Sequence, residues 1–177
     1  RHHRSYPRRR FGAPRGVDAF GHGTFMAGII AGRDAGVSAS AVGCTTCVNS
    51  SGYSTTAAYV GLAPQARIVN VKVGAADGAS DVTQVIAAVD WVTQHAQDPG
   101  MNIRVLNLSY GAESAQPYTI DPLAHAVEQA WRRGIVVVVS AGNEGKAAPE
   151  LADPAYDPFV VAVGGLDPRG RLSNSDD

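Results

Sequence analysis

The fold is decided by the stretch Ile135-Val136-Val137-Val138-Val139, which is followed directly by Ser140-Ala141-Gly142-Asn143. Five consecutive β-branched residues are apolar on both faces of an extended chain. Such a strand is typical of the middle of a parallel sheet that helices cover on both sides. The stretch therefore predicts an open, mostly parallel α/β sheet with this strand inside it.

Strand and helix patterns alternate around this stretch. Apolar residues recur at helical spacing in two segments, 81–96 and 123–131, and Gly134 can end the second helix. Three other runs rich in β-branched residues predict further strands, at 68–73, 103–108 and 159–163. A helix over 22–32 precedes them. Residues 33–63, rich in Gly, Ser, Thr and Ala without a sustained period, predict a long loop or an insertion.

Composition bounds the class of protein. The chain has 177 residues, is 45% apolar and holds 20 glycines, which fits one compact globular domain. No run of 18 apolar residues occurs, so no membrane span is expected. The net charge of -1 is uneven, because residues 1–15 hold six arginines and two histidines without any acid.

The arginine-rich block at residues 1–15 allows more than one interpretation. It could be an arm that binds nucleic acid or an anionic membrane, but nothing else in the chain is basic. We therefore expect no nucleic acid and no membrane among the partners. Residues 1–15 are interpreted as a disordered terminus or as a segment foreign to the domain, and residues 16–177 as the domain. The block lacks an apolar core, so we do not expect it to be a secretory signal.

Two segments that directly follow predicted strands carry groups suited to binding a ligand. In open parallel sheets, ligands gather at the carboxyl ends of the strands. Asn107-Leu108-Ser109-Tyr110-Gly111-Ala112 has small residues, which leave backbone amides and carbonyls open for an extended peptide to pair with. Ser140-Ala141-Gly142-Asn143-Glu144-Gly145 follows the central strand, and a carboxamide fixed there could donate a hydrogen bond to an oxyanion.

A third segment is Gly21-His22-Gly23-Thr24-Phe25-Met26-Ala27-Gly28-Ile29-Ile30-Ala31-Gly32. Glycine on both sides of the histidine leaves room for a substrate, and the apolar run after it predicts a helix pressed into a core. Histidine takes and returns protons around neutral pH, so His22 is a candidate general base.

In this order along the chain, the three segments resemble those of the subtilisin-like serine peptidases. The matches are His22-Gly23-Thr24 with Ala27-Gly28, Ser109-Tyr110-Gly111 and Ala141-Gly142-Asn143, with smaller ones at Gly61-Leu62-Ala63-Pro64, Asp77-Gly78 and Val161-Ala162-Val163-Gly164. The resemblance covers roughly residues 18–175. It implies a three-layer α/β fold with a mostly parallel central sheet, incomplete at both ends.

The resemblance gives each matching residue a role. His22 would be the general base, and the side-chain amide of Asn143 would stabilise the tetrahedral intermediate. Ser109, Tyr110 and Gly111 would pair with the substrate backbone on one side of the cleft, and Gly78 would belong to the opposing edge. Ser140, Ala141 and Gly142 would line the pocket for the residue before the cut.

Two members of the catalytic triad have no match. The family's triad runs Asp, His, Ser along the chain, and no Asp-Thr-Gly or Asp-Ser-Gly turn precedes His22. Asp18 matches a non-triad aspartate beside the cleft instead. Ser173 and Ser175 match a region ahead of the nucleophile segment, so neither is a good candidate. We expect this chain to be the middle of a catalytic domain and to be inactive alone.

Other candidate ligands carry weaker signals. Cys44-Thr45-Thr46-Cys47 has the spacing of a redox or metal pair but no partner pair, which leaves a local disulfide or a metal open. Calcium is allowed as a cofactor by the resemblance, but no ligands can be matched. Asp34, Asp77 and Asp81 are expected to be solvated loop or capping residues, and His95 and His125 surface or capping residues. We predict no metal ligand.

Three functions remain open. The first is a fragment of a subtilisin-like serine endopeptidase that acts on peptides or proteins through an acyl-enzyme intermediate, as a secreted or extracytoplasmic monomer. The second is a pseudoprotease or peptide-binding module that keeps the cleft without the nucleophile. The third is a nucleotide-binding α/β domain, which is disfavoured because no strand is followed by Gly-x-Gly-x-x-Gly.

Overall fold

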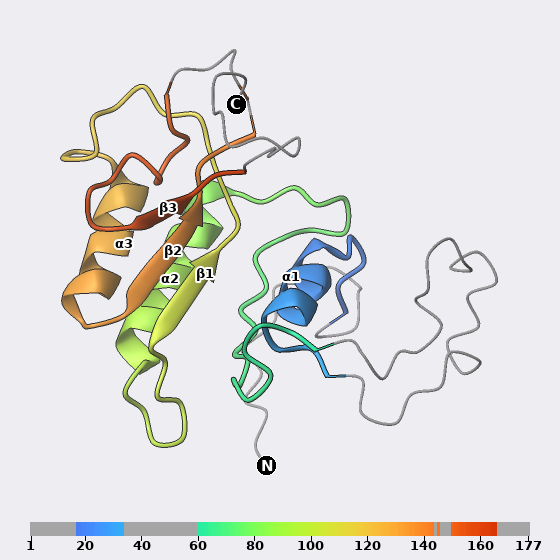
Figure 1. Cartoon of the computed structure of the whole chain (residues 1–177). Coiled ribbons are helices and arrows are strands. Elements are labelled where there is room, and N and C mark those ends of the chain that lie inside the picture. The colour runs from blue at the N-terminus through green and yellow to red at the C-terminus, as the bar shows by residue number, and fades with distance from the viewer. Residues whose placement is uncertain (1–16, 34–59, 144, 146–149, 166–177) are drawn as a thin grey trace, which may run out of the picture. The chain divides into compact units, whose positions relative to one another are not determined.

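A computed structural model describes residues 17–33, 60–143, 145 and 150–165 of the chain (Figure 1). The chain divides into two compact units, Arg1–Ala79 and Ser80–Asp177, and each is described by itself. The first unit contains α1 (His22–Ala31). The second contains α2 (Val82–His95), β1 (Val105–Leu108), α3 (Pro122–Arg132), β2 (Val136–Ser140) and β3 (Val161–Val163).

The second unit confirms the parallel sheet. Its strand order is β1-β2-β3, and both pairs are parallel. Val105 pairs with Val136, and Val138 pairs with Val161, which aligns the carboxyl ends of the strands at one edge. The valine-rich stretch is therefore the middle strand, as predicted.

Helices α2 and α3 pack together against one face of this sheet (Figure 1). Val137 and Val139 of β2 are 0% and 2% exposed, and they meet a core that includes Leu123 and Val127 of α3 and Val85 of α2. Burial of each such side chain stabilises the fold by about 1.5–3 kcal/mol relative to exposure. This core fixes the sheet edge from which the candidate site extends.

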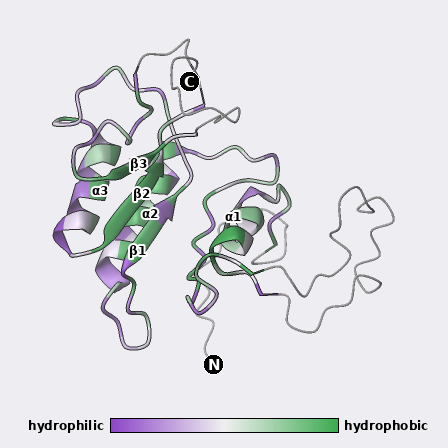
Figure 2. Cartoon of the chain, in the orientation of Figure 1, coloured by the Kyte–Doolittle hydropathy of each residue, from purple (hydrophilic) through white to green (hydrophobic). Residues whose placement is uncertain are grey.

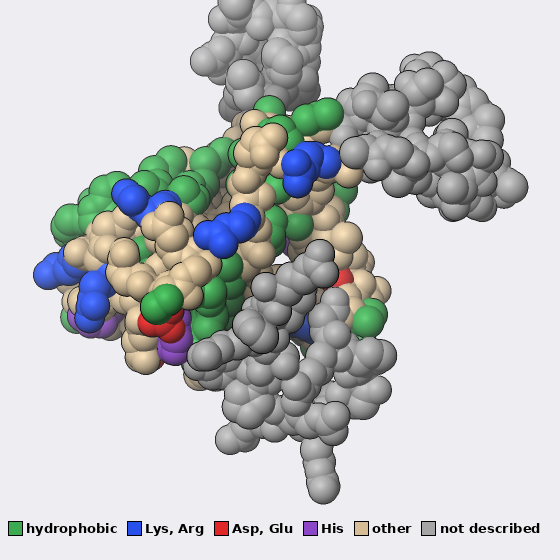
Figure 3. Space-filling view, turned by 90° about the horizontal axis from the view of Figure 1, so that it is seen from below, with side chains coloured by type: hydrophobic (Ala, Val, Ile, Leu, Met, Phe, Trp, Pro, Cys, Tyr) green, Lys and Arg blue, Asp and Glu red, His purple; other side chains and the backbone are tan. Residues whose placement is uncertain are grey.

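Within the second unit, both described helices lie on the same face of the sheet. Val136 and Val105 are exposed on the other face, since successive strand side chains alternate between faces, and all three residues of β3 are exposed. Figure 2 shows the strands coloured as hydrophobic, and Figure 3 shows hydrophobic side chains at the surface of the molecule.

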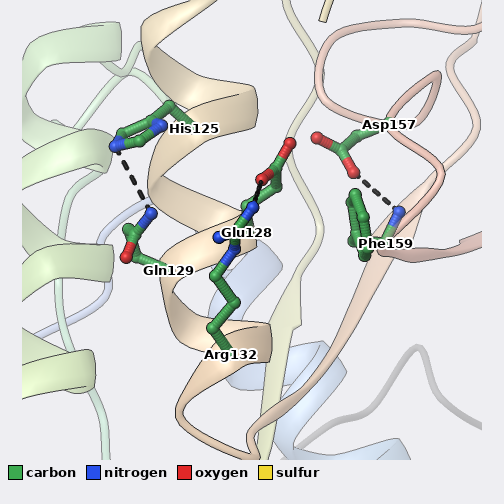
Figure 4. Close-up of polar contacts among 6 residues, drawn as sticks. All are labelled: His125, Glu128, Gln129, Arg132, Asp157 and Phe159. Atoms are coloured by element: carbon green, nitrogen blue, oxygen red, sulfur yellow. Dashed lines mark hydrogen bonds and ion pairs between the residues drawn. The ribbon is translucent and has the colours of Figure 1, made fainter. Parts of the chain in front are cut away.

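Aspartates cap the N-termini of both described helices of the second unit. The Asp81 carboxylate accepts a hydrogen bond from the Thr83 amide at 2.7 Å, and Asp121 accepts from the amides of Leu123 and Ala124 at 2.8 and 3.0 Å. These bonds satisfy amides that have no partner within the helix. Gly134, at φ 80°, follows the end of α3 as expected. On α3, the exposed Arg132 side chain pairs with Glu128 at 2.9 Å (Figure 4).

Two expectations for the first unit are wrong. Residues 68–73 form no strand, since a strand exists only where a neighbour completes its hydrogen bonds, and the unit's described residues supply none. Helix α1 forms where predicted but buries none of its residues, because the described part of this unit offers it no sheet or second helix to pack against.

The chain after the long loop closes the end of α1. The amides of Gly61, Leu62 and Ala63 donate to the carbonyls of Gly32, Ile29 and Ile30 at 2.8, 2.9 and 2.7 Å, which satisfies carbonyls left open at the helix end. A Cβ at Gly61 would lie 2.7 Å from the Gly32 nitrogen, so only glycine permits this approach. Most of the 33–63 segment lies outside the described residues.

Among the described residues, no helix is both long enough and apolar enough to cross a membrane.

Candidate active site

Asp18 holds the start of α1, where His22 is the first helical residue. The capping position belongs to Gly21, at φ 93°, which has no side chain to cap the helix. Asp18 takes over this role from three residues earlier: its carboxylate accepts from the Gly21 amide at 2.8 Å, the Thr24 amide at 2.8 Å and the Thr24 hydroxyl at 2.9 Å. The exposed His22 side chain is thus presented by a fixed helix end.

These hydrogen bonds lower the pKa of Asp18 to about 2, with the Gly21 amide contributing most and the Thr24 amide next. The nearby Lys72 ammonium, which donates to the Val17 carbonyl at 2.6 Å, acts in the same direction. A carboxylate is the natural partner of a helix N-terminus, where the partial charge is positive. The sequence suggested a place beside the cleft for Asp18, and missed its role in capping the helix.

Gly78 lies in a tight turn in the same unit as His22. Its φ is +87°, its amide donates to the Ala75 carbonyl at 3.2 Å, and the Ala75 amide donates to the Ala79 carbonyl at 2.8 Å. The ring of Phe20 lies directly over Gly78, because a Cβ there would be 2.6 Å from Phe20 Cε2. The glycine is therefore required both by the backbone and by the aromatic ring.

The two strand-end segments lie side by side in the second unit. Ser140, at the end of β2, donates from its hydroxyl to the Tyr110 carbonyl at 3.1 Å. The Asn107 amide group donates to the Ser109 hydroxyl at 3.0 Å. Tyr110 is thereby held against the end of the middle strand, and Ser109 is held against Asn107 of β1.

The backbone of residues 107–112 is less open than the sequence suggested. Ala112 exchanges two backbone hydrogen bonds with Asp153, at 3.0 and 2.9 Å, and the Tyr110 carbonyl accepts from Ser140. Between them, exposed Gly111 makes no backbone hydrogen bond to another described residue. Gly111 is the point in this segment at which an added strand could pair.

The segment after β2 is held from both sides. The Ala141 amide donates to the Val163 carbonyl of β3 at 2.9 Å, and the Ala141 carbonyl accepts from the Ala152 amide at 3.0 Å. Gly142 then turns with φ +120°, a conformation that side chains disfavour, and a Cβ there would lie 3.2 Å from the Ala152 methyl group. The exposed Asn143 follows this turn directly.

A buried acidic cluster behind these segments was missed by the sequence analysis. Asp121, Asp153 and Asp157 are 5%, 3% and 3% exposed. Burial first, and then the charge of Asp121, raise the pKa of Asp153 to about 6. The only sequence signal was the Asp-Pro pair at 153–154 and the Asp-Pro helix start at 121–122, which do not reveal that the two acids meet.

The remaining candidates stay apart from these segments. Asp81 caps α2, Asp77 accepts from the Ala79 amide at 3.0 Å, and His125 is exposed on α3, as expected for surface or capping residues. The described residues hold no group of three or more His, Cys, Asp or Glu side chains that could bind a metal ion. Asp34, Cys44, Cys47, Glu144, Ser173 and Ser175 lie outside the described residues.

Comparison with known proteins gives one consistent family. The family model described as the subtilase family matches residues 10–176. The serine protease AprX of Bacillus subtilis is 35% identical over 163 residues, which are 90% of this chain and 33% of that protein. Subtilisin-like protease 2 of Trichophyton verrucosum is 34% identical over 152 residues, which are 85% of this chain and 28% of that protein.

Solved structures agree on the fold. Sphericase matches with a TM-score of 0.54 and 25% identity, over 60% of this chain and 33% of its own. MycP1 with its N-terminal propeptide removed matches with a TM-score of 0.54 and 25% identity, over 86% of this chain and 47% of its own. The chain therefore spans about a third of the length of the curated relatives described above.

Proposed function

This chain belongs to the subtilase family, and from that membership we propose that it supplies the general base and the oxyanion donor of a serine endopeptidase. The peptidase would hydrolyse peptide bonds through an acyl-enzyme intermediate, outside the cytoplasm and as a monomer. The observation that carries the proposal is the turn at Gly142, which is held between β3 and Ala152 and leaves the Asn143 side chain exposed at the sheet edge.

In this proposal, His22 accepts the proton of the nucleophile and later gives it to the leaving amine. A base of this kind must keep one orientation while substrate enters and leaves. The Asp18 hydrogen bonds to Gly21 and Thr24 support the role, because they fix the turn of helix that carries the imidazole.

Asn143 donates a side-chain hydrogen bond to the oxyanion of the tetrahedral intermediate. A preorganised donor stabilises the charge that develops without having to reorient during the reaction. The support is the backbone on either side of Ala141, which limits how Gly142 and Asn143 can move.

Substrate binding is assigned to the neighbouring backbone. Ser109, Tyr110 and Gly111 would pair with the peptide on one edge, where Gly111 has backbone groups to offer, and Gly78 would belong to the opposing edge. Ser140, Ala141 and Gly142 would form the wall of the pocket for the residue before the cut. The partner is a peptide or protein.

No residue of this chain matches the triad aspartate or the nucleophilic serine, so we propose that activity requires residues beyond these 177. The same observation favours a second candidate, a peptide-binding module or pseudoprotease that keeps the cleft without cleaving. A form of the protein that carries a Gly-Thr-Ser-Met-Ala nucleophile segment separates the two, because only a peptidase would turn over substrate.

The first prediction concerns Asn143. In a form that cleaves casein, Asn143→Ala is expected to lower kcat by about 10²- to 10³-fold with little change in KM, the size known for loss of an oxyanion donor in a subtilisin. Steady-state kinetics on wild type and variant would measure the effect.

The matched control is Asn70→Ala, which removes an exposed asparagine carboxamide from the other unit and should leave kcat within about twofold. An Asn143→Ala variant with unchanged kcat would remove the oxyanion role. Binding of casein without any turnover by the wild type would favour the peptide-binding alternative.

A further inference from the structure

The buried carboxyl groups of Asp121 and Asp153 occupy different kinds of environment. Asp121 is fully engaged: its carboxylate accepts from the amides of Leu123 and Ala124 and from the Ser114 hydroxyl, at 2.8, 3.0 and 2.9 Å. Asp153 is 3% exposed, and its Oδ1 atom has no hydrogen-bond partner. Two adjacent buried carboxyl groups are costly to ionise together, so one of them keeps its proton to a higher pH than a carboxyl group in water does.

The environments decide which group holds that proton. Burial acts to raise the pKa of Asp121, but the hydrogen bonds from Ala124, Ser114 and Leu123 outweigh it and lower the pKa. For Asp153, burial and the Asp121 charge raise the pKa to about 6. The groups that act on Asp153 are Asp121 at the start of α3 and Tyr156 and Asp157 on its own loop, and none of them is a cation.

The backbone of Asp153 connects this pair to the candidate substrate segment. Its amide and carbonyl form the bridge to Ala112, one residue after Gly111, and the preceding residue, Ala152, donates to the Ala141 carbonyl. The pair also affects Tyr110: burial and the charge of Asp153 raise the pKa of the Tyr110 hydroxyl group. A movement of Asp153 therefore reaches both strand-end segments.

We propose that Asp153 is a proton-dependent positioning residue: its protonated carboxyl group beside Asp121 holds the Ala112–Asp153 bridge, and loss of the proton loosens the bridge and the segment Ser109–Ala112. Asp121 stays in place, because its carboxylate caps the N-terminus of α3. An ionised Asp153 has no cation to pair with, so it lowers its free energy by turning toward water, and its backbone moves with it. The effect on substrate rests on the proposed function, whereas the loosening does not.

Amide hydrogen exchange in the 177-residue chain tests the loosening. After correction for the intrinsic pH dependence of exchange, protection of the Ala112 and Asp153 amides is expected to fall about tenfold between pH 5 and pH 7.5, the equivalent of one pKa unit. The Val136 amide, which donates to the Arg104 carbonyl at the other end of β2, serves as the internal reference and should not change in this way.

Two variants test the assignment to this pair. Asp153→Asn resembles the protonated state and should keep Ala112 protected at both pH values. Asp121→Asn keeps a good helix cap but removes the charge, so the midpoint of the Asp153 titration, followed by carboxyl carbon NMR, should move to lower pH.

Asp157→Asn is the matched control. Asp157 is equally buried and burial raises its pKa, but its carboxylate accepts from the Phe159 amide at 2.7 Å (Figure 4). This variant should keep a pH-dependent profile at Ala112, with its midpoint moved to lower pH by less than in Asp121→Asn, because the charge of Asp157 raises the pKa of Asp153 less than that of Asp121 does. Three results would each overturn the proposal. They are equal pH dependence of protection at Ala112 and Val136 in the wild type, a wild-type pH dependence at Ala112 in Asp153→Asn, and loss of the pH dependence at Ala112 in Asp157→Asn.

A form of the protein that cleaves peptides adds a readout of substrate. In the wild type of that form, KM is expected to rise across the same pH window. In the Asp153→Asn variant, KM should become independent of pH, and kcat should equal that of the wild type. A wild-type KM that does not follow Ala112 protection would overturn the link to substrate. If no form cleaves peptide, the proposed function fails, and hydrogen exchange alone still decides whether the pair controls the bridge.

Discussion

At the scale of single residues, Asp18 shows how a carboxylate outside a helix can fix its first turn. Because Gly21 has no side chain, the three hydrogen bonds from Gly21 and Thr24 to Asp18 replace an ordinary cap. Asp18→Ala is expected to lower the helical content of α1 and the resistance of residues 17–33 to proteolysis. Circular dichroism and limited proteolysis would measure this, with Asp98→Ala, an exposed aspartate after α2, as the control. Equal behaviour of the two variants would contradict the capping role.

The same carboxylate predicts a direction for the pH dependence of stability. Its pKa lies below the ordinary value of 3.8, at about 2, so its contribution is complete above pH 3.8 and is lost as the pH falls toward 2. The difference in unfolding free energy between wild type and Asp18→Ala should therefore shrink in this window. A difference that stays constant down to pH 2 would contradict the pKa.

Asp153 predicts the opposite direction. Its pKa in the folded chain, about 6, exceeds 3.8, so the folded state binds more protons between these values and stability falls as the pH rises through them. Asp153→Asn should consequently raise Tm at pH 7.5 and change it little at pH 4. Differential scanning fluorimetry at the two pH values would show it, and an equal shift at both would contradict the buried ionisation.

At the scale of elements, the apolar pattern predicted α2, α3 and the three strands of the sheet to within a few residues at each end. Each of these elements carries the periodicity of the face it buries, as Val85, Val89 and Val92 do on α2. Residues 68–73 have an equally strong β-branched run but form no strand, because pairing depends on a neighbour that the run itself does not specify.

The candidate site likewise contains some residues that the sequence indicated and others that it did not. Gly142 and Gly78 were singled out by the resemblance to the family, and the structure gives both a positive φ angle, which favours glycine. The Asp121–Asp153 pair could not be singled out by sequence, since 32 positions separate two residues that only the packing of the segment before β3 near the start of α3 brings together. Contacts of this kind depend on tertiary structure rather than on a local pattern.

The one-sided packing of the sheet predicts different costs for adjacent residues of β2. Val137 is fully buried and Val136 is 41% exposed. Val137→Ala should lower the free energy of unfolding by about 2 kcal/mol through lost burial and a cavity, whereas Val136→Ala should cost less than about 1 kcal/mol. Urea unfolding of the 177-residue chain measures both. Equal losses would show that the second face is covered as well.

At the scale of the whole molecule, the residues to which the proposal gives roles come from both units. His22 and Gly78 belong to Arg1–Ala79, and Asn143 with the Ser109–Gly111 and Ser140–Gly142 segments belongs to Ser80–Asp177. In the first unit, the start of the helix that carries His22 is capped by hydrogen bonds. In the second unit, the segments that follow two strands are joined by a hydrogen bond. The family match spans residues 10–176 and therefore includes residues of both units.

In the function proposed above, this chain carries the base and the oxyanion donor of a serine peptidase but not its nucleophile. Labelling by a serine-reactive fluorophosphonate can compare the 177-residue chain with a longer form that carries the nucleophile segment. We expect no label on the 177-residue chain, rapid labelling of the longer form, and loss of that labelling in its His22→Ala variant. Labelling of the 177-residue chain at Ser173 or Ser175, or a His22→Ala variant that is labelled as rapidly as the wild type, would contradict it.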